Sequence, residues 1–273
     1  MSNDEADVAA LDAIVIESDL QGGTDAQWAA ADALYKKAEI VERRDGPRAA
    51  VDLYTEVARR LDGVREPGPR ELLMCALHDA ANIHHDLGHM VESRSAAERL
   101  VADHFDAPPD DTVDVLVSAT LLLATLRHDA GEPERALELL EDLLERYGQP
   151  GAPDHELTAA AADASAAWII GNLGRADEGI RRYDRVIAAL GRPADEIRRT
   201  ILARSLGRQG KLLYDAGRPS EGKARLDELI ERFADDATAE IAEQVEWARE
   251  TLEYHGRAGA RRFGLRRRSS HTR

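Results

Sequence analysis

The residues best suited to metal binding or acid–base catalysis are histidines in the first half of the chain: His78, His84, His85, His89, His104 and His128. His85 and His128 lie 43 residues apart, and an aspartate follows each of them. An imidazole beside a carboxylate can bind a metal ion or act as a general base. No compact ligand motif such as HExxH accompanies them, however. The two aspartates that follow these histidines, Asp86 and Asp129, are succeeded at the same 43-residue spacing by Asn172 and Asp215. This recurring position fits a structural role at helix ends better than a metal site.

Other catalytic signatures are missing from the sequence. It contains no GxSxG motif, no glycine-rich phosphate loop and no convincing pair of carboxylates. The single cysteine, Cys75, falls within a predicted helix, where a packed thiol is more common than a nucleophile. One cysteine allows no internal disulfide and fits a reducing compartment. We therefore predict no catalytic residue, no metal site and no cofactor.

The composition favours a helical protein of the cytoplasm. The chain is 43% hydrophobic but only 4% aromatic, and its abundant Ala and Leu favour helix over strand. No apolar segment is long enough to span a bilayer without charged residues. The acidic N-terminal segment does not match a secretory signal. We expect a cytoplasmic protein without a transmembrane segment.

Positive charge is concentrated at the C-terminal end. Residues 257–273 contain seven arginines and no acid, and removing them from the net charge of −16 leaves −23 on residues 1–256. An acidic body repels nucleic acid, so nucleic-acid binding could come only from the tail between Arg257 and Arg273. That tail has a single aromatic residue, Phe263, for base stacking. It also has too few apolar groups to pack, so we predict that it is disordered.

Glycines recur through the chain at a fixed period. Gly88, Gly131, Gly174 and Gly217 are each 43 residues apart, and Gly46 lies 42 residues before Gly88. Each glycine follows one helical pattern and precedes another, as expected for a turn within a helix pair. A fixed period of this length indicates stacked copies of one supersecondary unit.

Small residues keep the same period on both sides of these turns. Seven residues before the last four glycines stand Ala81, Ala124, Ala167 and Gly210, and five residues after them stand Ser93, Ala136, Gly179 and Gly222. Small side chains at both positions would let the two helices of one unit cross closely. We expect Ala136, for example, to lie at such a crossing.

This spacing of small residue, turn glycine and small residue resembles the tetratricopeptide repeat (TPR) family over about residues 25–256. The period of 43 exceeds the usual 34 of that family, which implies longer helices, similar to those of kinesin light chains and bacterial regulator TPR domains. The aromatic and terminal proline positions of the family are mostly unfilled. A HEAT-like repeat has the right period and stays open as the structural alternative.

The expected fold is all-α: a right-handed α-solenoid of five TPR-like helix pairs with a capping helix at each end. The pairs cover about residues 25–63, 70–106, 110–148, 154–191 and 193–234. Residues 1–24 would form the N-terminal cap, residues 25–256 the repeat domain with a closing helix over 236–254, and residues 257–273 the basic tail. The Gly- and Pro-rich segment 148–154 is the best candidate for a hinge.

In TPR proteins the first helices of successive pairs line a concave groove, and the resemblance implies the same surface here. The predicted partner-binding residues are Tyr35, Glu39, His78, Asn82, His85, Thr125, His128, Trp168, Asn172, Arg204, Lys211 and Tyr214. The carboxylate clamp of chaperone-binding TPRs is not present, because only Asn82 and Lys211 match its residue types.

The function we expect from this resemblance is a non-enzymatic protein–protein interaction scaffold that presents the groove to a segment of a protein or peptide partner. A ligand- or peptide-sensing regulatory TPR domain is the first alternative, and a metal-dependent enzyme at His85 and His128 ranks behind both. The sequence leaves the partner, the pathway and the oligomeric state open.

Overall fold

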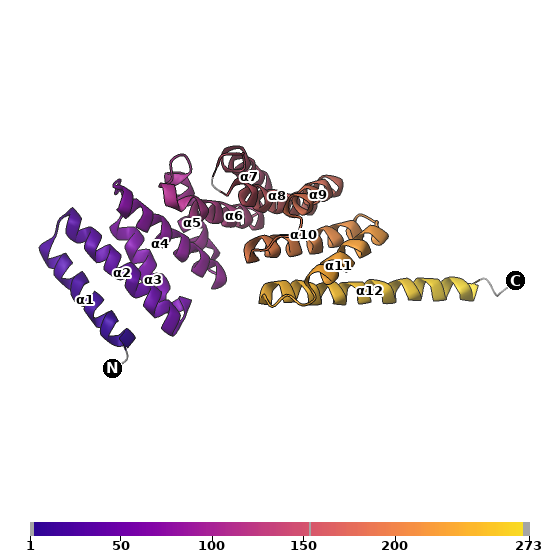
Figure 1. Cartoon of the computed structure of the whole chain (residues 1–273), viewed down its shortest axis with the longest axis horizontal. Coiled ribbons are helices and arrows are strands. Elements are labelled where there is room, and N and C mark those ends of the chain that lie inside the picture. The colour runs from indigo at the N-terminus through magenta and orange to yellow at the C-terminus, as the bar shows by residue number, and fades with distance from the viewer. Residues whose placement is uncertain (1–2, 153, 270–273) are drawn as a thin grey trace. The chain divides into compact units, whose positions relative to one another are not determined.

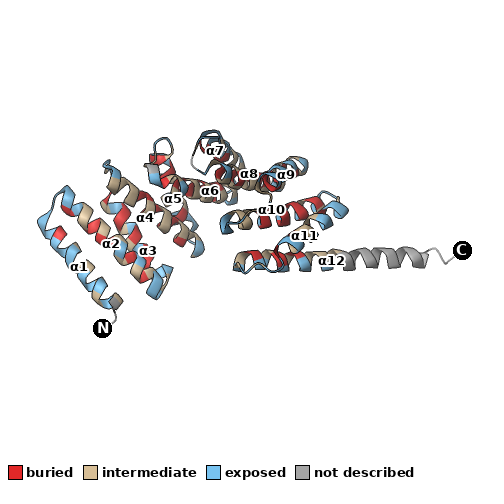
Figure 2. Ribbon diagram, viewed as in Figure 1, coloured by how far each residue is buried: buried red, intermediate tan, exposed pale blue. Residues whose placement is uncertain are grey.

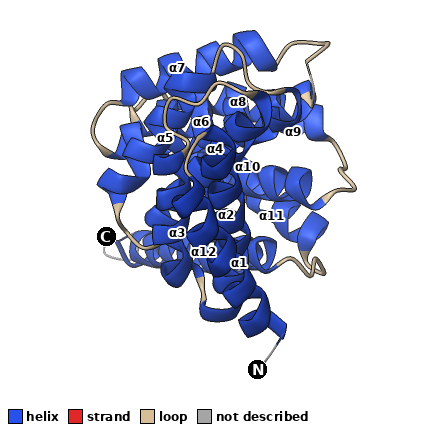
Figure 3. Cartoon of the chain, turned by 90° about the vertical axis from the view of Figure 1, so that its left-hand side faces the viewer, coloured by secondary structure: helices blue, strands red, loops and turns tan. Residues whose placement is uncertain are grey.

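The computed structural model describes residues 3–152 and 154–269, without the side chains of residues 3, 110 and 256–269. The described residues form twelve α-helices and one short 3₁₀ helix. They contain no β-strand, only an isolated bridge between Pro150 and Ala152 (Figure 3). The predicted all-α class is therefore confirmed.

The chain divides into two compact units, residues 1–139 and residues 140–273. The boundary falls inside helix α7 (Pro133–Tyr147), N-terminal to the segment 148–154 that the sequence marks as a candidate hinge. That hinge stays a prediction. We describe the two units one after the other.

Unit 1 contains a lone helix followed by helix pairs joined by short turns (Figure 1). Its helices are α1 (Asn3–Gln21), α2 (Thr24–Asp45), α3 (Pro47–Arg60), α4 (Pro67–Asp86), α5 (Met90–His104), η1 (Asp110–Thr112), α6 (Val113–Asp129) and the first part of α7. α1 packs against α2, as a capping helix would. The bounds of α2/α3 and α4/α5 match the first two predicted pairs.

Unit 2 repeats this plan and ends in a long helix. After the second part of α7 it contains α8 (His155–Asn172), α9 (Ala176–Leu190), α10 (Glu196–Asp215), α11 (Pro219–Phe233) and α12 (Ala239–Ser269). The sequence predicts that the closing helix ends near Tyr254, but in the structure α12 ends at Ser269. Its end therefore lies within the segment predicted as a disordered tail, of which residues 270–273 are outside the described residues.

The repeating glycines end the first helix of each pair. Gly88, Gly131, Gly174 and Gly217 all have φ between +76° and +81°, a region that glycine enters at little cost. After α4, the N–H of Gly88 donates to the carbonyl oxygen of His85 at 2.9 Å. The N–H of His89 then donates to the carbonyl oxygen of His84 at 2.8 Å, which closes the turn before α5.

The small residues lie where the two helices of a pair cross. In α8/α9, a Cβ placed on Gly179 would come within 2.9 Å of the carbonyl oxygen of Ala167. In α10/α11, a Cβ on Gly222 would lie 2.8 Å from the carbonyl oxygen of Gly210. These distances leave room only for a hydrogen atom, so the predicted close crossing is confirmed for these pairs.

Apolar residues are buried on successive helices of both units, and Figure 2 colours the buried residues red. In unit 2, Leu206 of α10 and Leu229 of α11 belong to one buried cluster with Ile241 and Val245 of α12. α12 thus covers the apolar face that α10 and α11 would otherwise expose to water, which is the role of a capping helix in a repeat array.

Candidate functional site

The first helices of successive pairs are neighbours in unit 1, and polar side chains connect them. The hydroxyl of Tyr35 on α2 donates to Asp79 of α4 at 2.7 Å. His78 Nε2 of α4 lies 2.9 Å from Ser118 Oγ of α6. Asn82, one turn after His78, donates to its carbonyl oxygen at 3.0 Å. These contacts link three of the predicted residues, Tyr35, His78 and Asn82, on neighbouring helices. We call the seven predicted residues of this unit the unit 1 face: Tyr35, Glu39, His78, Asn82, His85, Thr125 and His128.

An open recess of about 610 Å³ lies at the α2 end of this face. Its lining residues are Tyr35, Glu39, Glu42, Arg43, Pro47, Tyr54 and Asp79. The rings of Tyr35 and Tyr54 meet edge to face, with their centroids 5.3 Å apart. Tyr54 and Asp79 are absent from the predicted set. The sequence signals that could have found them are the repeat column of Tyr54 and the position of Asp79 next to His78.

The two phenols of this recess are held as neutral donors. Burial, followed by a hydrogen bond to Asp79, raises the pKa of Tyr35 far above its ordinary value. Tyr54 donates to Glu42 at 2.8 Å, and burial together with that bond raises its pKa in the same direction. Tyr54 is only 2% exposed, so of the two phenols only the half-buried Tyr35 can offer a partner its ring and its oxygen lone pairs. Its proton is already donated to a carboxylate.

The remaining predicted residues of unit 1 do not form a metal site. His85 Nδ1 lies 3.4 Å from its neighbour Asp86, and Thr125 donates to the carbonyl oxygen of Leu121 in its own helix. His128 is half-buried on α6. Nowhere in the described parts of the chain do three or more His, Cys, Asp or Glu side chains lie close enough to hold a metal ion.

The thiol of Cys75 is poorly suited to nucleophilic attack. It is half-buried on α4, and burial, with a smaller contribution from Asp79, raises its pKa to about 11. The attacking species would be the thiolate, which is scarce near neutral pH at such a value. This agrees with the packed thiol expected from the sequence.

In unit 2 the predicted residues lie on α8 and α10, and we call Trp168, Asn172, Arg204, Lys211 and Tyr214 the unit 2 face. Trp168 is half-buried and packs against the core cluster of the unit. Asn172 and Lys211 are exposed, and Lys211 Nζ pairs with Asp215 Oδ2 at 2.6 Å. The predicted aromatic and cationic side chains are therefore both present on the first helices of this unit.

Three further contacts tie this face to the rest of unit 2. The guanidinium of Arg208 lies 5.1 Å from the ring centroid of Trp168, a cation–π distance. Tyr214 stacks on His255 of α12, with the ring centroids 4.0 Å apart. Arg204 forms an ion pair with Glu240, also on α12. The closing helix therefore covers part of the surface that sequence reasoning assigned to a partner.

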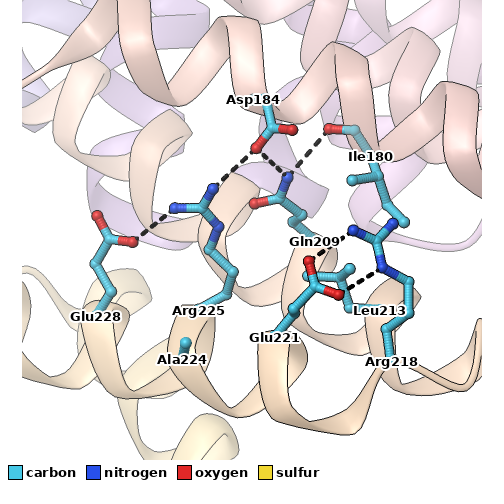
Figure 4. A pocket seen from close by; sticks show the side chains of 9 residues that line it. All are labelled: Ile180, Asp184, Gln209, Leu213, Arg218, Glu221, Ala224, Arg225 and Glu228. Atoms are coloured by element: carbon cyan, nitrogen blue, oxygen red, sulfur yellow. Dashed lines mark hydrogen bonds and ion pairs between the residues drawn. The ribbon is translucent and has the colours of Figure 1, made fainter.

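A smaller pocket of about 230 Å³ lies between α9, α10 and α11 (Figure 4). Gln209 is fully buried there and donates to the carbonyl oxygen of Ile180 at 3.1 Å and to Asp184 at 2.8 Å. Arg225 bridges Asp184 and Glu228, at 2.9 Å to each. Sequence reasoning missed this site. Its ion pair between Asp184 of α9 and Arg225 of α11 joins two successive repeats, so we assign this pocket a structural role.

No described helix is both long enough and apolar enough to cross a membrane.

Helix pairs that cross at small residues and turn at a positive-φ glycine define the fold as that of the tetratricopeptide repeat proteins. Neither a protein-family model nor a curated protein sequence matches the chain. Solved structures do match its fold. One is BtubC (BKLC) from P. vanneervenii, at 17% identity and a TM-score of 0.60, over 84% of this chain and 90% of that one.

A tetratricopeptide repeat protein from Parabacteroides merdae ATCC 43184 aligns at 14% identity and a TM-score of 0.59, over 93% of this chain and 89% of its own. The apo form of RapI aligns at 13% identity and a TM-score of 0.64, over 83% of this chain but only 59% of RapI. At these identities the likeness concerns the fold.

Proposed function

We propose that this protein is a non-enzymatic interaction scaffold whose unit 1 face and unit 2 face bind segments of protein or peptide partners. The observation that carries the proposal is the open recess at Tyr35 and Glu39, because it lies on the first-helix surface that the repeat pattern marks for binding. The helices around it are held by a packed core, so the recess is a preformed binding surface.

The chemistry of the recess supports binding over catalysis. The hydroxyls of Tyr35 and Tyr54 are both engaged with carboxylates, so neither is poised to transfer a proton. Its lining carries three carboxylates, on Glu39, Glu42 and Asp79, against the single guanidinium of Arg43. A basic or hydrogen-bond-donating group of a partner segment would complement this charge.

On the unit 2 face we assign the anchor role to Trp168, with Asn172 and Lys211 as exposed polar neighbours. Aromatic residues that keep part of their surface accessible on a rigid frame are frequent binding anchors. Arg204 and Tyr214 contribute less in this proposal, because both contact α12.

A sensor that encloses a small ligand is the alternative class. Such a domain needs a closed pocket, whereas the larger recess is open. The polar groups of the smaller pocket largely pair with one another. These features support display of a surface, and we keep the scaffold as the conclusion, with a cytoplasmic location as part of the proposal.

The test is a charge reversal in the recess. Partners would be captured from the native cell with the wild-type chain and with Glu39→Arg, and identified by mass spectrometry. The matched control is Glu134→Arg, at an exposed glutamate on α7. We expect Glu39→Arg to lose partners that the wild type and the control both retain. Identical partner sets for all three would refute the role of the unit 1 face.

A further inference from the structure

Arg208 of α10 is an exposed arginine that lies over the ring of Trp168. Its guanidinium carbon is 5.1 Å from the centroid of the indole. None of the described carboxylates forms an ion pair with Arg208, whereas Arg204 and Lys211 on the same helix each pair with an acidic residue. Beside the unit 2 face, the charge of Arg208 is therefore left without a carboxylate.

A buried phenol next to Arg208 shows the same lack of an acceptor. Tyr183 of α9 is 1% exposed, and the proton of its hydroxyl has no acceptor among the described residues. Burial raises the pKa of Tyr183 to about 12, and the charge of Arg208 acts against that rise. Arg208 must lie close to the phenol to do so, but a guanidinium can only donate hydrogen bonds. No described carboxylate therefore lies within hydrogen-bond reach of this hydroxyl.

The equivalent place in unit 1 has the carboxylates that are missing here. Four positions recur after 129 residues, which is three periods of 43, as the pairs Tyr54 and Tyr183, Glu39 and Trp168, Glu42 and Gly171, and Asp79 and Arg208. In unit 1, Glu42 accepts the hydrogen bond of Tyr54 at 2.8 Å. In unit 2, Gly171 has no side chain that could accept one, and Arg208 replaces an aspartate. The acceptor that unit 1 contains must come from outside the chain in unit 2.

We propose that Arg208, held over Trp168, binds the carboxylate of an aspartate or glutamate in the partner segment. A guanidinium can donate two parallel N–H···O bonds to a carboxylate. Its contact with the indole restricts its motion before the partner arrives, which lowers the entropy cost of binding. This role rests on the proposed function, since it names the chemical group that the unit 2 face takes. The two faces then differ in preference, because the recess of unit 1 favours a basic group.

A carboxylate matches the charge of this place better than a phosphate does. Arg204 and Lys211 are already paired with acidic neighbours, so the single positive charge of Arg208 is left to compensate. A carboxylate carries one negative charge, whereas a phosphate monoester carries nearly two at neutral pH. The chain has a net charge of −16, which disfavours the more highly charged ligand.

Two blocked tripeptides and inorganic phosphate test the proposal on the full chain. The peptides are acetyl-Leu-Asp-Leu-amide and acetyl-Leu-Asn-Leu-amide, which differ only in the charged group. NMR follows the indole N–H signal of Trp168, assigned with Trp168→Phe, as each probe is added up to millimolar concentration. We expect the Asp peptide to shift this signal and to bind at least about tenfold more tightly than the Asn peptide. Arg208→Gln should remove that difference.

The control variant is Arg181→Gln, at an exposed arginine of α9 outside the unit 2 face, and it should bind both peptides like the wild type. Circular dichroism checks that both variants stay folded. Equal affinity for the two peptides, no shift with the Asp peptide, or an unchanged preference in Arg208→Gln would each overturn the proposal. Phosphate binding as tight as that of the Asp peptide, and equally dependent on Arg208, would overturn the assignment to a carboxylate and indicate a general anion site.

Failure of this role can be told apart from failure of the proposed function. The capture experiment with Glu39→Arg concerns unit 1 and does not involve Arg208. Partners that Glu39→Arg loses, together with an Asp peptide that does not bind, would leave the scaffold standing and remove only the carboxylate site at Arg208.

Discussion

The hydroxyl of Ser93 on α5 donates a hydrogen bond of 2.8 Å to the backbone carbonyl oxygen of Ala81 on α4. Both residues are fully buried. They occupy the same two repeat columns as Ala167 and Gly179, where the backbones also approach closely. The hydroxyl of Ser93 fits at this crossing because the opposing carbonyl oxygen accepts its proton.

Replacing Ser93 with leucine should force α4 and α5 apart. Overpacking of this kind costs about 1–3 kcal/mol, so we expect a lower midpoint of urea unfolding with native-like helicity below it. Ser95→Leu, at an exposed position of the same helix, should leave the midpoint nearly unchanged. If Ser93→Leu unfolds at the wild-type midpoint, the assigned crossing is in error.

Ala136 is in the same column one repeat after Ser93 and is fully buried. Ala136→Leu is expected to lower the free energy of unfolding by a similar amount, about 1–3 kcal/mol. Glu138→Leu, at an exposed position of α7, is the control for added apolar surface. Thermal unfolding, monitored by circular dichroism, compares the melting temperatures of the two variants. A wild-type melting temperature for Ala136→Leu would mean that Ala136 does not lie at a helix crossing.

Two glycines of unit 2 should respond to alanine with opposite signs. A Cβ on Gly222 would come within 2.8 Å of both the Gly210 carbonyl oxygen and a ring carbon of Tyr214, whereas a Cβ on Gly207 would meet only side-chain atoms at 3.4 Å or more. Alanine stabilises a helix interior by about 1 kcal/mol over glycine. Gly207→Ala should therefore raise the melting temperature and Gly222→Ala should lower it. A rise in both would contradict the close approach of α10 and α11.

The ion pair between Arg225 and Asp184, 2.9 Å long, should couple two successive repeats. Arg182 and Glu141 form the equivalent pair 43 residues earlier. A double-mutant cycle of Arg225→Ala and Asp184→Ala should give a coupling free energy of about 0.2–1 kcal/mol, because both side chains are partly exposed. The coupling should shrink at about 1 M salt. A salt-independent coupling would mean that packing, and not charge, joins the two side chains.

His104 should make unit 1 sensitive to acid. The side chain is 3% exposed, and burial, then the charge of Arg70, lowers its pKa below the ordinary value of 6.5. The unfolded chain therefore takes up a proton first as the pH falls. The contribution of His104 to the free energy of unfolding is therefore fully present above pH 6.5 and is lost as the pH falls below that value. Urea unfolding at pH 7 and pH 5 measures this slope.

The matched variant for that experiment is His104→Gln, which keeps a polar side chain without a titrating group. Its loss of stability between pH 7 and pH 5 should be smaller than that of the wild type. His84, whose pKa is also lowered by burial, stays in both proteins. An equal slope for wild type and variant would remove His104 as the cause.

Trp168→Ala should weaken a partner bound to the unit 2 face by about thirtyfold, which corresponds to about 2 kcal/mol. Because Trp168 also packs on the core of unit 2, a moderate loss of stability should accompany this change. Binding is therefore compared at a temperature where circular dichroism shows the variant folded. Glu231→Ala, at an exposed position of α11 outside the unit 2 face, serves as the surface control. Full binding by the folded Trp168→Ala variant would exclude Trp168 as an anchor.

The repeat and its register could be predicted from the sequence, because each helix pair imposes the same steric demands on its own copy of the motif. The residues at a crossing must be small in every copy, as Ala81 and Gly222 show. The residue that ends the first helix must accept a positive φ, as Gly88 does. Such local demands leave a pattern at a fixed period, and helix bounds follow from it.

The contacts that make up the candidate site were decided only by the tertiary structure. Tyr35 reaches Asp79 across 44 residues of chain, and no local preference specifies that partner. The position of α12 determines that Tyr214 stacks on His255 and is not free for a partner. A side chain's neighbours depend on how separate helices pack and on which rotamers that packing permits, whereas periodicity reports only the face on which each residue lies.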